Sequence, residues 1–487
     1  MTQQHLFIDG EFTAGHGTPM DAVNPYTESA WAQIDTATPD DVSDAVAAAE
    51  RAFESWRRVS GLRRAELLNA LADELNRGAD GLAEIESTDN GKIIRETRSQ
   101  MRFAARNYRF VAGAADKLDG CTKMLDSRDT VDLTTLEPLG PVALITPWNS
   151  PIGILANKLG PALAAGNTVV IKPSEHTTAS TLAFAEMIRR AGFPPGVVNI
   201  ISGSAVVGEA LATDPRIRRI SFTGSPSVGR RMAEYAARNL IPTTLELGGK
   251  GANVVCSDAD LSRAIPGVLA GIFAASGQTC VAGSRLLIHR SLHDEVVEVL
   301  AGRAETVRCG DPLQMETEMG PVAHRGQRES ILGFIDRARD DGAELVAGGR
   351  DATERIGGLF IAPTIFTGVR PDAELAREEV FGPVLAVIAF DDDDEAVAIA
   401  NSTDYGLASG VWTESLRRGH RIARELRSGT VWVNTYRSSA AQAPFGGMKR
   451  SGYGRERGLE AISEYVQVKN TMIELSDEVR DPFAIKV

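Results

Sequence analysis

Hydrophobic and polar positions divide the chain into parts with different periodicities. Residues 5–35 show short apolar runs separated by turn residues, which predicts short strands. Thr38 and Pro39 then mark a helix start, because a threonine can cap a helix and a proline fits its first turn. Alanine-rich amphipathic patterns follow to about Ala115 and predict a mostly helical front section.

Between residues 141 and 248, near-continuous apolar runs alternate with helical stretches. The runs end in the segments 142–145, 169–171, 197–201, 220–222 and 245–247. This alternation predicts a parallel sheet covered by helices on both faces, because strands buried on both faces are apolar throughout. Ligands on such sheets bind beyond the carboxyl ends of the strands, which is where polar residues follow these runs. A second α/β region extends from about 249 to 450.

Two β-like stretches have no partner within this scheme. Residues 130–136 form an extended pattern between helical sections, and the tail at 465–469 alternates in the same way. A strand isolated between helices needs a partner elsewhere in its own chain or in another subunit. The tail could pair with the 130–136 strand of a neighbouring subunit.

Length and composition indicate an ordinary globular chain. Its 487 residues predict two or three domains, and a net charge of -13 argues against a nucleic-acid surface. The four cysteines show neither close pairing nor metal-ligand spacing, so we expect a reducing compartment, no disulfides and no metal site. The N-terminus has no signal-peptide pattern, and no apolar run approaches the roughly 18 residues of a membrane span. We therefore expect a soluble cytoplasmic protein that binds neither nucleic acid nor membranes.

Three separated residues carry candidate chemistry. Cys280 follows Gly-Gln-Thr beyond an apolar helical run, Glu246 ends a strand-like run, and Asn149 follows Pro-Trp after another run. A thiol, a carboxylate and an amide are the groups needed to attack a carbonyl, activate water and hold an oxyanion. Each has a simpler alternative: a lone cysteine is usually a small buried apolar residue, a glutamate in an apolar run can be a satisfied buried carboxylate, and an asparagine favours turns. Their occurrence together favours the catalytic interpretation.

The cofactor signal is indirect, because the strict G-x-G-x-x-G fingerprint of dinucleotide-binding folds is absent. A glycine turn at Thr223-Gly224-Ser225 opens a helix, and such a turn either presents free N–H groups to a phosphate or is only a turn. Lys172 and Glu175 follow the second apolar run, where a ribose lies in such a sheet. A carboxylate there accepts from the 2′-hydroxyl and repels a 2′-phosphate, which predicts NAD rather than NADP.

With these motifs, the chain resembles the aldehyde dehydrogenase superfamily from about residue 5 to about residue 470. The matching segments, in chain order, are Thr146–Asn149, Lys172–Glu175, Phe222–Ser225, Leu245–Lys250, Gly277–Cys280, Glu379–Pro383 and Pro444–Gly447. The resemblance implies an α/β fold with a Rossmann-type parallel-sheet cofactor domain, an α/β catalytic domain and a small β oligomerisation element. The implied boundaries are 1–119 and 139–248 for the NAD-binding domain, 249–450 for the catalytic domain, and 120–138 and 466–487 for the oligomerisation element. Family members are usually dimers or tetramers.

The resemblance also implies individual roles. Cys280 is the nucleophile, the Asn149 side chain and the Cys280 backbone N–H form the oxyanion hole, and Glu246 is the general base. Lys172 and Glu175 hold the adenine-side ribose, and a helix terminus, Lys172 or Glu246 are the candidates for activating the thiol. The cofactor contacts expected on this basis are Thr146, Trp148, Lys172, Ser174, Glu175, Gly208, Phe222, Thr223, Gly224, Ser225, Leu247, Glu379 and Phe381.

The substrate channel is expected to use residues in which the family varies. The candidates are Asn149, Asn157, Val281, Tyr436, Arg437 and Phe445. An arginine and an asparagine near the channel mouth can recognise a carboxylate, a hydroxyl or a ring substituent, which favours a polar-substituted or aromatic aldehyde over a plain alkanal. The alternative is that Arg437 points to solvent or pairs with an acid at a subunit boundary.

The predicted reaction is the NAD-dependent oxidation of an aldehyde to the carboxylic acid, through a thiohemiacetal and a thioester on Cys280. A CoA-acylating semialdehyde dehydrogenase would use the same thiol without needing Glu246 to activate water. A non-catalytic NAD-binding protein on this scaffold would not need the set of Cys280, Glu246 and Asn149. Ester hydrolysis is a conceivable side activity, because it shares the acyl-enzyme step.

Overall fold

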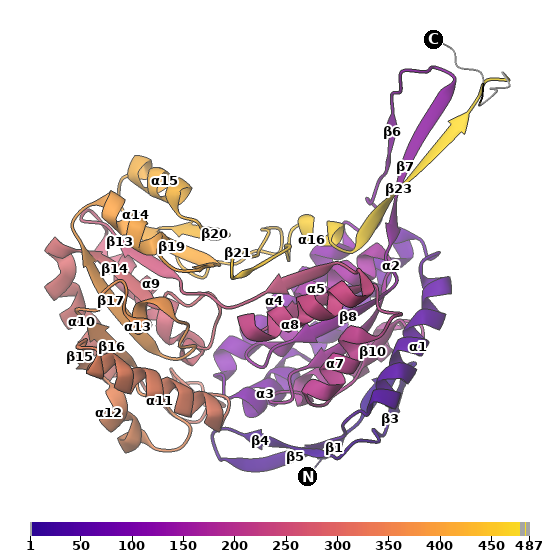
Figure 1. Cartoon of the computed structure of the whole chain (residues 1–487). Helices are drawn as coiled ribbons and strands as arrows, with labels where there is room; N and C mark the ends of the chain where they lie inside the picture. The colour runs from indigo at the N-terminus through magenta and orange to yellow at the C-terminus, as the bar shows by residue number, and fades with distance from the viewer. Residues whose placement is uncertain (1, 478–482, 484–487) are drawn as a thin grey trace.

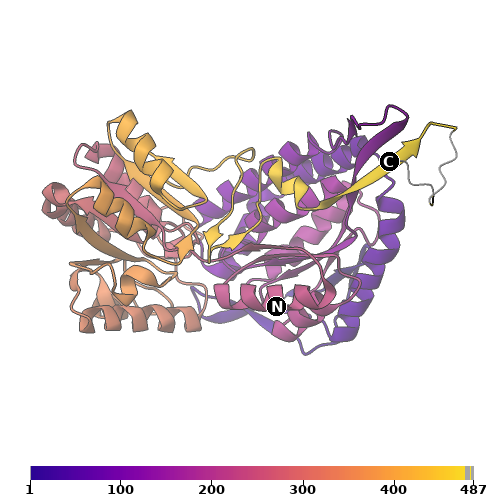
Figure 2. The same cartoon turned by 45° about the horizontal axis from the view of Figure 1, so that its top comes forward.

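Two α/β lobes lie side by side, and a narrow arm of strands projects from one of them (Figures 1 and 2). The structure is a computed structural model that describes residues 2–477 and 483. The predicted α/β class with parallel-strand sheets is confirmed. Within the described residues, no helix is long and apolar enough to cross a membrane.

The first lobe is built on an eight-stranded sheet in the order β22-β12-β11-β8-β9-β10-β2-β3. Its parallel strands are β8 (Pro141–Thr146), β9 (Thr168–Pro173), β10 (Val198–Ile200), β11 (Arg219–Thr223) and β12 (Thr243–Glu246). The outer strands are β2 (Leu6–Ile8), β3 (Glu11–Thr13) and β22 (Gly452–Tyr453). The chain runs outward from β8 through β9 to β10 and then returns to the other side of β8 as β11. This reversal leaves a crevice at the carboxyl ends of β8 and β11, the position at which open α/β sheets bind ligands.

Helices cover both faces of this sheet, as the sequence pattern predicts (Figure 1). They are α1 (Pro39–Trp56), α2 (Gly61–Arg77), α3 (Ala79–Asn90), α4 (Ile94–Ala112), α5 (Pro151–Ala165), α6 (Ala179–Ala191), α7 (Ala205–Thr213) and α8 (Pro226–Asn239). Helix α1 begins where predicted: the Asp41 N–H donates to the Thr38 hydroxyl and the Thr38 N–H donates to the Asp41 carboxylate at 2.8 Å. A small sheet at the N-terminus contains β1 (Thr2–Gln4), β4 (Met20–Asn24) and β5 (Ser29–Ile34).

The second lobe contains a seven-stranded sheet in the order β15-β16-β17-β14-β13-β19-β20. Its strands are β13 (Ala252–Val255), β14 (Arg285–His289), β15 (Glu344–Ala347), β16 (Thr364–Thr367), β17 (Val384–Phe390), β19 (Ala408–Trp412) and β20 (Thr430–Val433). Its helices are α9 (Leu261–Phe273), α10 (His293–Glu305), α11 (Arg325–Asp340), α12 (Gly349–Ile356), α13 (Glu374–Arg377), α14 (Asp393–Asn401) and α15 (Leu416–Glu425). The short strand β18 (Tyr405–Gly406), just before β19, pairs antiparallel with β21 (Met448–Lys449), which follows β20. The chain then returns to the first lobe through β22 and α16 (Glu460–Ser463).

The projecting arm corrects the expected pairing of the tail. β23 (Val466–Glu474) pairs antiparallel along its whole length with β7 (Thr130–Pro138) of the same chain, and β6 (Cys121–Lys123) pairs with the other edge of β7. Asn167 holds both strands at their base, because its Oδ1 accepts from the Leu139 N–H at 2.7 Å and its Nδ2 donates to the Tyr465 carbonyl at 2.8 Å. The two strands therefore leave the lobe together, and no neighbouring subunit is needed to pair them.

Candidate active site

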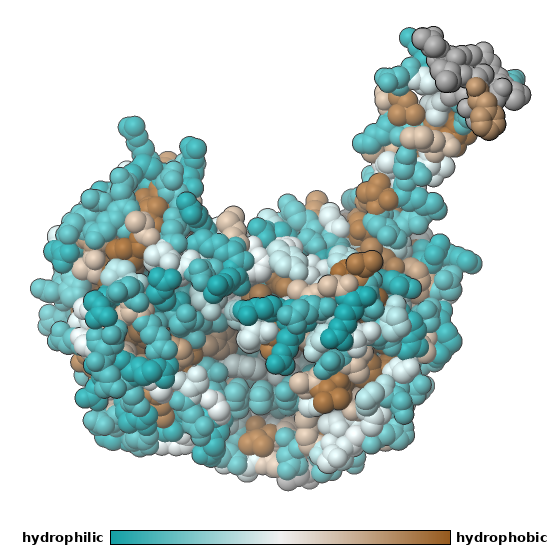
Figure 3. Space-filling view, viewed as in Figure 1, coloured by the Kyte–Doolittle hydropathy of each residue, from teal (hydrophilic) through white to brown (hydrophobic). Residues whose placement is uncertain are grey.

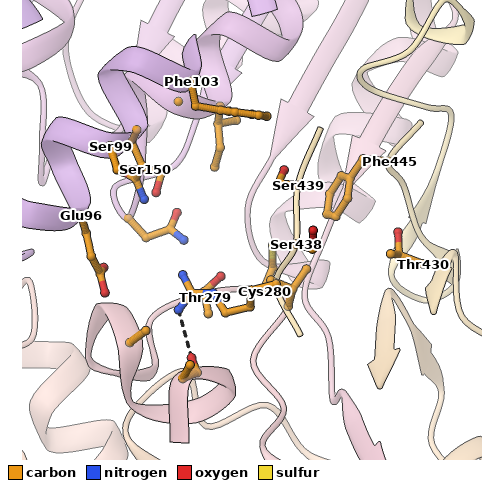
Figure 4. A pocket seen from close by; sticks show the side chains of 18 of the residues that line it. Glu96, Ser99, Phe103, Ser150, Thr279, Cys280, Thr430, Ser438, Ser439 and Phe445 are labelled. Carbon is orange, nitrogen blue, oxygen red and sulfur yellow. Dashed lines mark hydrogen bonds between the residues drawn. The ribbon is translucent and has the colours of Figure 1, made fainter. Parts of the chain in front are cut away.

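A cavity of about 1070 Å³ contains the three residues predicted to carry the chemistry. Its wall includes Cys280, Glu246 and Asn149, together with side chains from α4, α5, α9 and the segment after β20. Figure 4 shows Cys280 and Thr279 facing the same space as Phe103 and Phe445. Residues separated by more than a hundred positions in the sequence thus meet at one place between the lobes.

Cys280 is aimed by a tight segment that follows α9. Ala275, Ser276 and Gly277 all have positive φ, at 53°, 54° and 70°, and a Cβ on Gly277 would lie only 2.1 Å from the Gly382 carbonyl oxygen. The Ala275 N–H donates to the Glu96 carboxylate at 3.0 Å, and the Ser276 hydroxyl donates to the Gly320 carbonyl at 2.8 Å. Neighbouring elements therefore hold this unusual backbone in place, as expected at a functional site.

The Cys280 thiol is neutral at physiological pH in this environment. Burial, together with the carboxylates of Glu379 and Glu246, raises its pKa to about 12, while Arg457 acts in the opposite direction. Because the thiolate is the nucleophile, a base must take the proton as the sulfur attacks. Lys172 does not line this cavity, and its Nζ lies 3.1 Å from the Pro173 carbonyl, so Glu246 is the better-placed candidate base.

Asn149 lies beside the nucleophile. Its Nδ2 donates to the Gln278 carbonyl at 2.9 Å, which leaves the second amide hydrogen for an oxyanion in the cavity. Lys92 fixes this turn, because its Nζ donates to the Asn149 carbonyl and, at 2.6 Å, to the Ser150 hydroxyl. Lys92 was not among the predicted site residues, because the sequence around it, between α3 and α4, contains no motif that predicts this contact.

Glu246 is a buried carboxylate, and neither of its oxygens has a hydrogen-bond partner among the described residues. Burial raises its pKa well above the ordinary value, and the negative charge of Glu456 raises it further. Glu456 itself forms a buried ion pair with Lys158, with Nζ and Oε1 2.6 Å apart. Both oxygens of Glu246 can therefore accept a hydrogen bond from a water molecule in the cavity. A carboxylate that takes a proton from water must be able to make this contact.

The polar groups at the carboxyl ends of β8 and β11 suit the binding of a dinucleotide. The hydroxyls of Thr146 and Thr223, at the ends of these two strands, are buried and have no partner among the described residues. Ser225 caps α8, whose free N–H groups open toward the same side, and Lys172 at the end of β9 lies 3.8 Å from Glu175. Orphaned buried polar atoms of this kind indicate a ligand that supplies their missing bonds.

Glu379 and Phe381 close this crevice from the second lobe. The Gly249 N–H donates to the Glu379 carboxylate at 2.9 Å, and a Cβ on Gly248 would lie 2.0 Å from the same carboxylate. Burial raises the pKa of Glu379 to about 7. The Phe381 ring packs edge-on against the Trp148 ring, with centroids 5.1 Å apart. The other predicted cofactor residues lie around the same sheet edge: Ser174 after β9, Gly208 on α7 against Lys172, Phe222 on β11, Gly224 before α8, and Leu247 after β12.

Most predicted substrate residues line the Cys280 cavity, but Tyr436 does not. Asn157, Val281, Arg437 and Phe445 all contribute to its wall. The Tyr436 ring is instead buried in the core of the second lobe, where its hydroxyl donates to the Val281 carbonyl at 3.2 Å. The prediction of a substrate contact was wrong for this residue, because neighbouring glycines leave room for the ring behind the Cys280 segment.

Arg437 lies in the cavity wall. Its Nη1 donates to the Ala270 carbonyl at 3.2 Å, and its backbone φ is 59°. Asn157 is more firmly held: its Oδ1 accepts from the Asn107 amide at 2.7 Å and from the Arg457 Nε at 3.3 Å. Both residues therefore present polar groups to a bound molecule.

Comparison with known proteins identifies the family. The sequence profile of the Aldehyde dehydrogenase family matches residues 12–471. The chain belongs to the aldehyde dehydrogenase family. The predicted class of enzyme, an aldehyde dehydrogenase oxidoreductase, is confirmed by this match.

Relatives of this aldehyde dehydrogenase match it over nearly its full length. It is 45% identical, over 100% of both chains, to (Z)-2-((N-methylformamido)methylene)-5-hydroxybutyrolactone dehydrogenase of Acinetobacter baylyi. The solved structure of PnpE from Pseudomonas sp. WBC-3 superposes with a TM-score of 0.96 at 41% identity, covering 99% of this chain and 100% of the other. The NAD+ complex of the Bacillus cereus aldehyde dehydrogenase superposes with a TM-score of 0.95 at 40% identity, covering 97% of each chain. The predicted cofactor, NAD, agrees with this complex.

Within the described residues, no cluster of three or more histidine, cysteine or acidic side chains has the arrangement of a metal site.

Proposed function

We propose that this aldehyde dehydrogenase oxidises an aldehyde to the carboxylic acid with NAD, through a thiohemiacetal and a thioester on Cys280. The observation that carries the proposal is the meeting of three groups in one cavity: the Cys280 thiol, the free amide hydrogen of Asn149 and the unpartnered carboxylate of Glu246. They correspond to nucleophile, oxyanion donor and base.

In the first half of the reaction, Glu246 takes the proton of the Cys280 thiol as the sulfur attacks the aldehyde carbon. The carbonyl oxygen becomes an oxyanion, which accepts from the Asn149 amide and from the Cys280 backbone N–H. A donor of this kind contributes about 3 kcal/mol to transition-state stabilisation. Bound NAD supplies the acceptor for the hydride that leaves the substrate carbon, and Cys280 is left as a thioester.

In the second half, Glu246, having released the thiol proton to solvent, removes a proton from water, and the resulting hydroxide attacks the thioester carbon. The carbon–sulfur bond breaks, the acid leaves, and Cys280 regains its proton from Glu246, which returns to the carboxylate form. The raised pKa of Glu246 suits this role, because burial and the nearby Glu456 make its carboxylate a stronger base than an exposed one. The overall change consumes one aldehyde, one NAD+ and one water.

The proposed function predicts NADH formation from NAD and an aldehyde without any need for coenzyme A. We expect the product to be the free acid, and we expect added coenzyme A to leave the initial rate unchanged, because Glu246 is placed to activate water. NADH absorbance and chromatographic analysis of the product check this. Strong stimulation by coenzyme A, with an acyl-CoA product, would instead support the CoA-acylating alternative.

The preference for NAD over NADP is proposed to depend on Glu175. Its partly exposed carboxylate lies 3.8 Å from the Lys172 ammonium, where it would repel a 2′-phosphate. We expect Glu175→Gln to raise kcat/KM for NADP relative to NAD by about tenfold, equivalent to about 1.4 kcal/mol. Glu186→Gln is the matched control, because Glu186 lies on α6 and pairs with two surface arginines. A clear NADP preference of the unaltered enzyme would contradict the proposal.

We further propose that the arm of β6, β7 and β23 mediates assembly into a dimer or tetramer. Large apolar side chains remain exposed on it, including Val468 at 67% and Met472 at 62%. Figure 3 shows apolar patches along this arm, whereas most of the surface in that view is hydrophilic. Exposed apolar groups on a narrow projection are typical of a surface that packs against another subunit.

The substrate is proposed to be a polar-substituted or aromatic aldehyde. Aromatic rings, Phe103 and Phe445, line the cavity together with Asn157 and Arg437. These residues provide apolar faces for a ring and hydrogen-bond donors for a polar substituent.

A further inference from the structure

Arg457 places a guanidinium in the wall of the Cys280 cavity without a carboxylate partner. Its Nε donates to Asn157 Oδ1 at 3.3 Å and its Nη1 donates to the Ser439 hydroxyl, and both acceptors are neutral. Within the described residues, no carboxylate oxygen lies within 4.0 Å of its charged nitrogens. A guanidinium carries five N–H donors, so several remain for a bound molecule.

Of the four carboxylates that line the same cavity, three are already engaged, and the fourth, Glu246, forms no ion pair with Arg457 within 4.0 Å. Glu456 pairs with Lys158, and Glu318 pairs with Arg303 at 2.7 Å. Glu96 accepts from the Ala275 N–H. The charge of Arg457 is therefore not neutralised by direct contact, and a partly buried unpaired cation favours an anionic ligand.

Two aromatic rings fix the guanidinium. Arg457 Cζ lies 5.2 Å from the centroid of the Phe103 ring and 5.0 Å from that of Phe445. Figure 4 shows both rings on the cavity wall near Cys280. Contact with ring faces orients the planar group and leaves its edge, which carries the N–H donors, for a ligand.

The backbone at this position supports the same conclusion. Arg457 has a φ of 58°, a left-handed conformation that costs free energy in a residue with a side chain. The conformation persists because the side chain is held by Asn157, Ser439 and the two rings. Such an outlier in a cavity wall indicates a position kept for a function.

We propose that Arg457 binds a carboxylate at the end of the substrate remote from the aldehyde, so that the preferred substrates are monoaldehydes of dicarboxylic acids. Arginine recognises a carboxylate through two parallel N–H···O bonds, which also fix the orientation of the bound molecule. Asn157 assists, because only its oxygen is used by protein contacts and its amide N–H groups are free among the described residues. The assignment rests on the proposed function, since it concerns the substrate of that reaction.

The test compares each acid with the ester that lacks its negative charge: 4-formylbenzoate with its methyl ester, and 5-oxopentanoate with its methyl ester. We expect the unaltered enzyme to prefer both acids. Arg457→Met is expected to lower kcat/KM about 100-fold more for the acids than for the esters, mainly through KM, because an effect of the guanidinium on Cys280 is common to both. Arg457→Lys keeps the charge but loses the paired bonds, so we expect a smaller loss of about tenfold for the acids. Arg303→Met is the matched control, because Arg303 lines the cavity but is paired with Glu318.

Equal losses for acids and esters in both Arg457 variants would make the residue structural and overturn the proposal, as would an unaltered enzyme with no preference for either acid. A binding measurement separates this outcome from failure of the proposed function. Calorimetric titration of the NAD-loaded enzyme with terephthalate should show affinity about 100-fold weaker in Arg457→Met, whether or not any aldehyde is oxidised. Equal terephthalate affinities in the two proteins would overturn the anion site. NADH formation from the esters by Arg457→Met would show that the proposed function stands independently.

Discussion

Cys280→Ser is expected to lower kcat for NADH formation by a factor on the order of 10⁴ or more. Burial already raises the pKa of the thiol to about 12, and a serine hydroxyl in the same place is a weaker acid and a poorer nucleophile. The oxygen is smaller than sulfur and keeps the polar character of the side chain, so the fold should not change. Steady-state absorbance at saturating aldehyde and NAD measures the loss, and NAD titration by protein fluorescence shows whether the cofactor still binds.

Cys121→Ser is the matched control for this substitution. Cys121 is exposed on the arm, and hydrogen bonds from Thr134 and Lys123 lower the pKa of its thiol. Acidity alone would therefore select Cys121 as the nucleophile, whereas the cavity geometry selects Cys280. We expect Cys121→Ser to retain full activity. Activity above about 1% of the unaltered enzyme in Cys280→Ser would remove Cys280 from the nucleophile role.

The sequence predicted the parts of the site that depend on local order along the chain. A polar residue directly after an apolar strand must lie at a sheet edge, which placed Thr146, Asn149 and Thr223 at the carboxyl ends of β8 and β11. The cap of α1 at Thr38 followed from the same kind of local rule. These predictions needed only strand direction, helix termini and the order of motifs.

Contacts between distant segments were beyond such reasoning. Arg457 contacts Asn157, which lies 300 positions away in the sequence, and the residues flanking each of them contain no motif that predicts the contact. Tyr436 and Arg437 are adjacent, yet the Tyr436 side chain lies in the core and the Arg437 side chain lines the cavity. The Tyr436 ring lies in the core because nearby glycines leave space for it there. The partner of the tail was likewise undecided, since a strand's pattern of side chains is the same whether it pairs within its chain or with another.

The second large effect is expected for Glu246→Gln, which should give at most one burst of NADH, slowed because the Cys280 thiol also loses its base, and then stall. Glutamine has the same shape but cannot accept a proton, so water is not activated and the thioester on Cys280 persists. The burst should not exceed one NADH per active site, and the steady rate should fall by a factor on the order of 10² to 10⁴. Stopped-flow absorbance measures the burst, and intact-protein mass spectrometry detects the acyl group. Glu318→Gln, which removes a cavity carboxylate that is paired with Arg303, is the control and should turn over steadily.

The pH dependence gives an independent check on Glu246. Its pKa is raised in the folded protein, so hydrolysis of the thioester should accelerate as pH rises through that pKa, and Glu246→Gln should lose this dependence.

The stability of the fold should change with pH in the opposite direction. The folded state holds the proton more tightly than the unfolded state, so stability contributed by this group is present below the ordinary carboxyl pKa and is lost as pH rises through the folded value. Glu246→Gln should therefore match the unaltered enzyme in thermal stability in acid and exceed it at alkaline pH, where the isolated charge no longer has to be buried. Steady turnover at the rate of the unaltered enzyme, or a stability loss that is the same at every pH, would show that Glu246 is a structural carboxylate rather than the base.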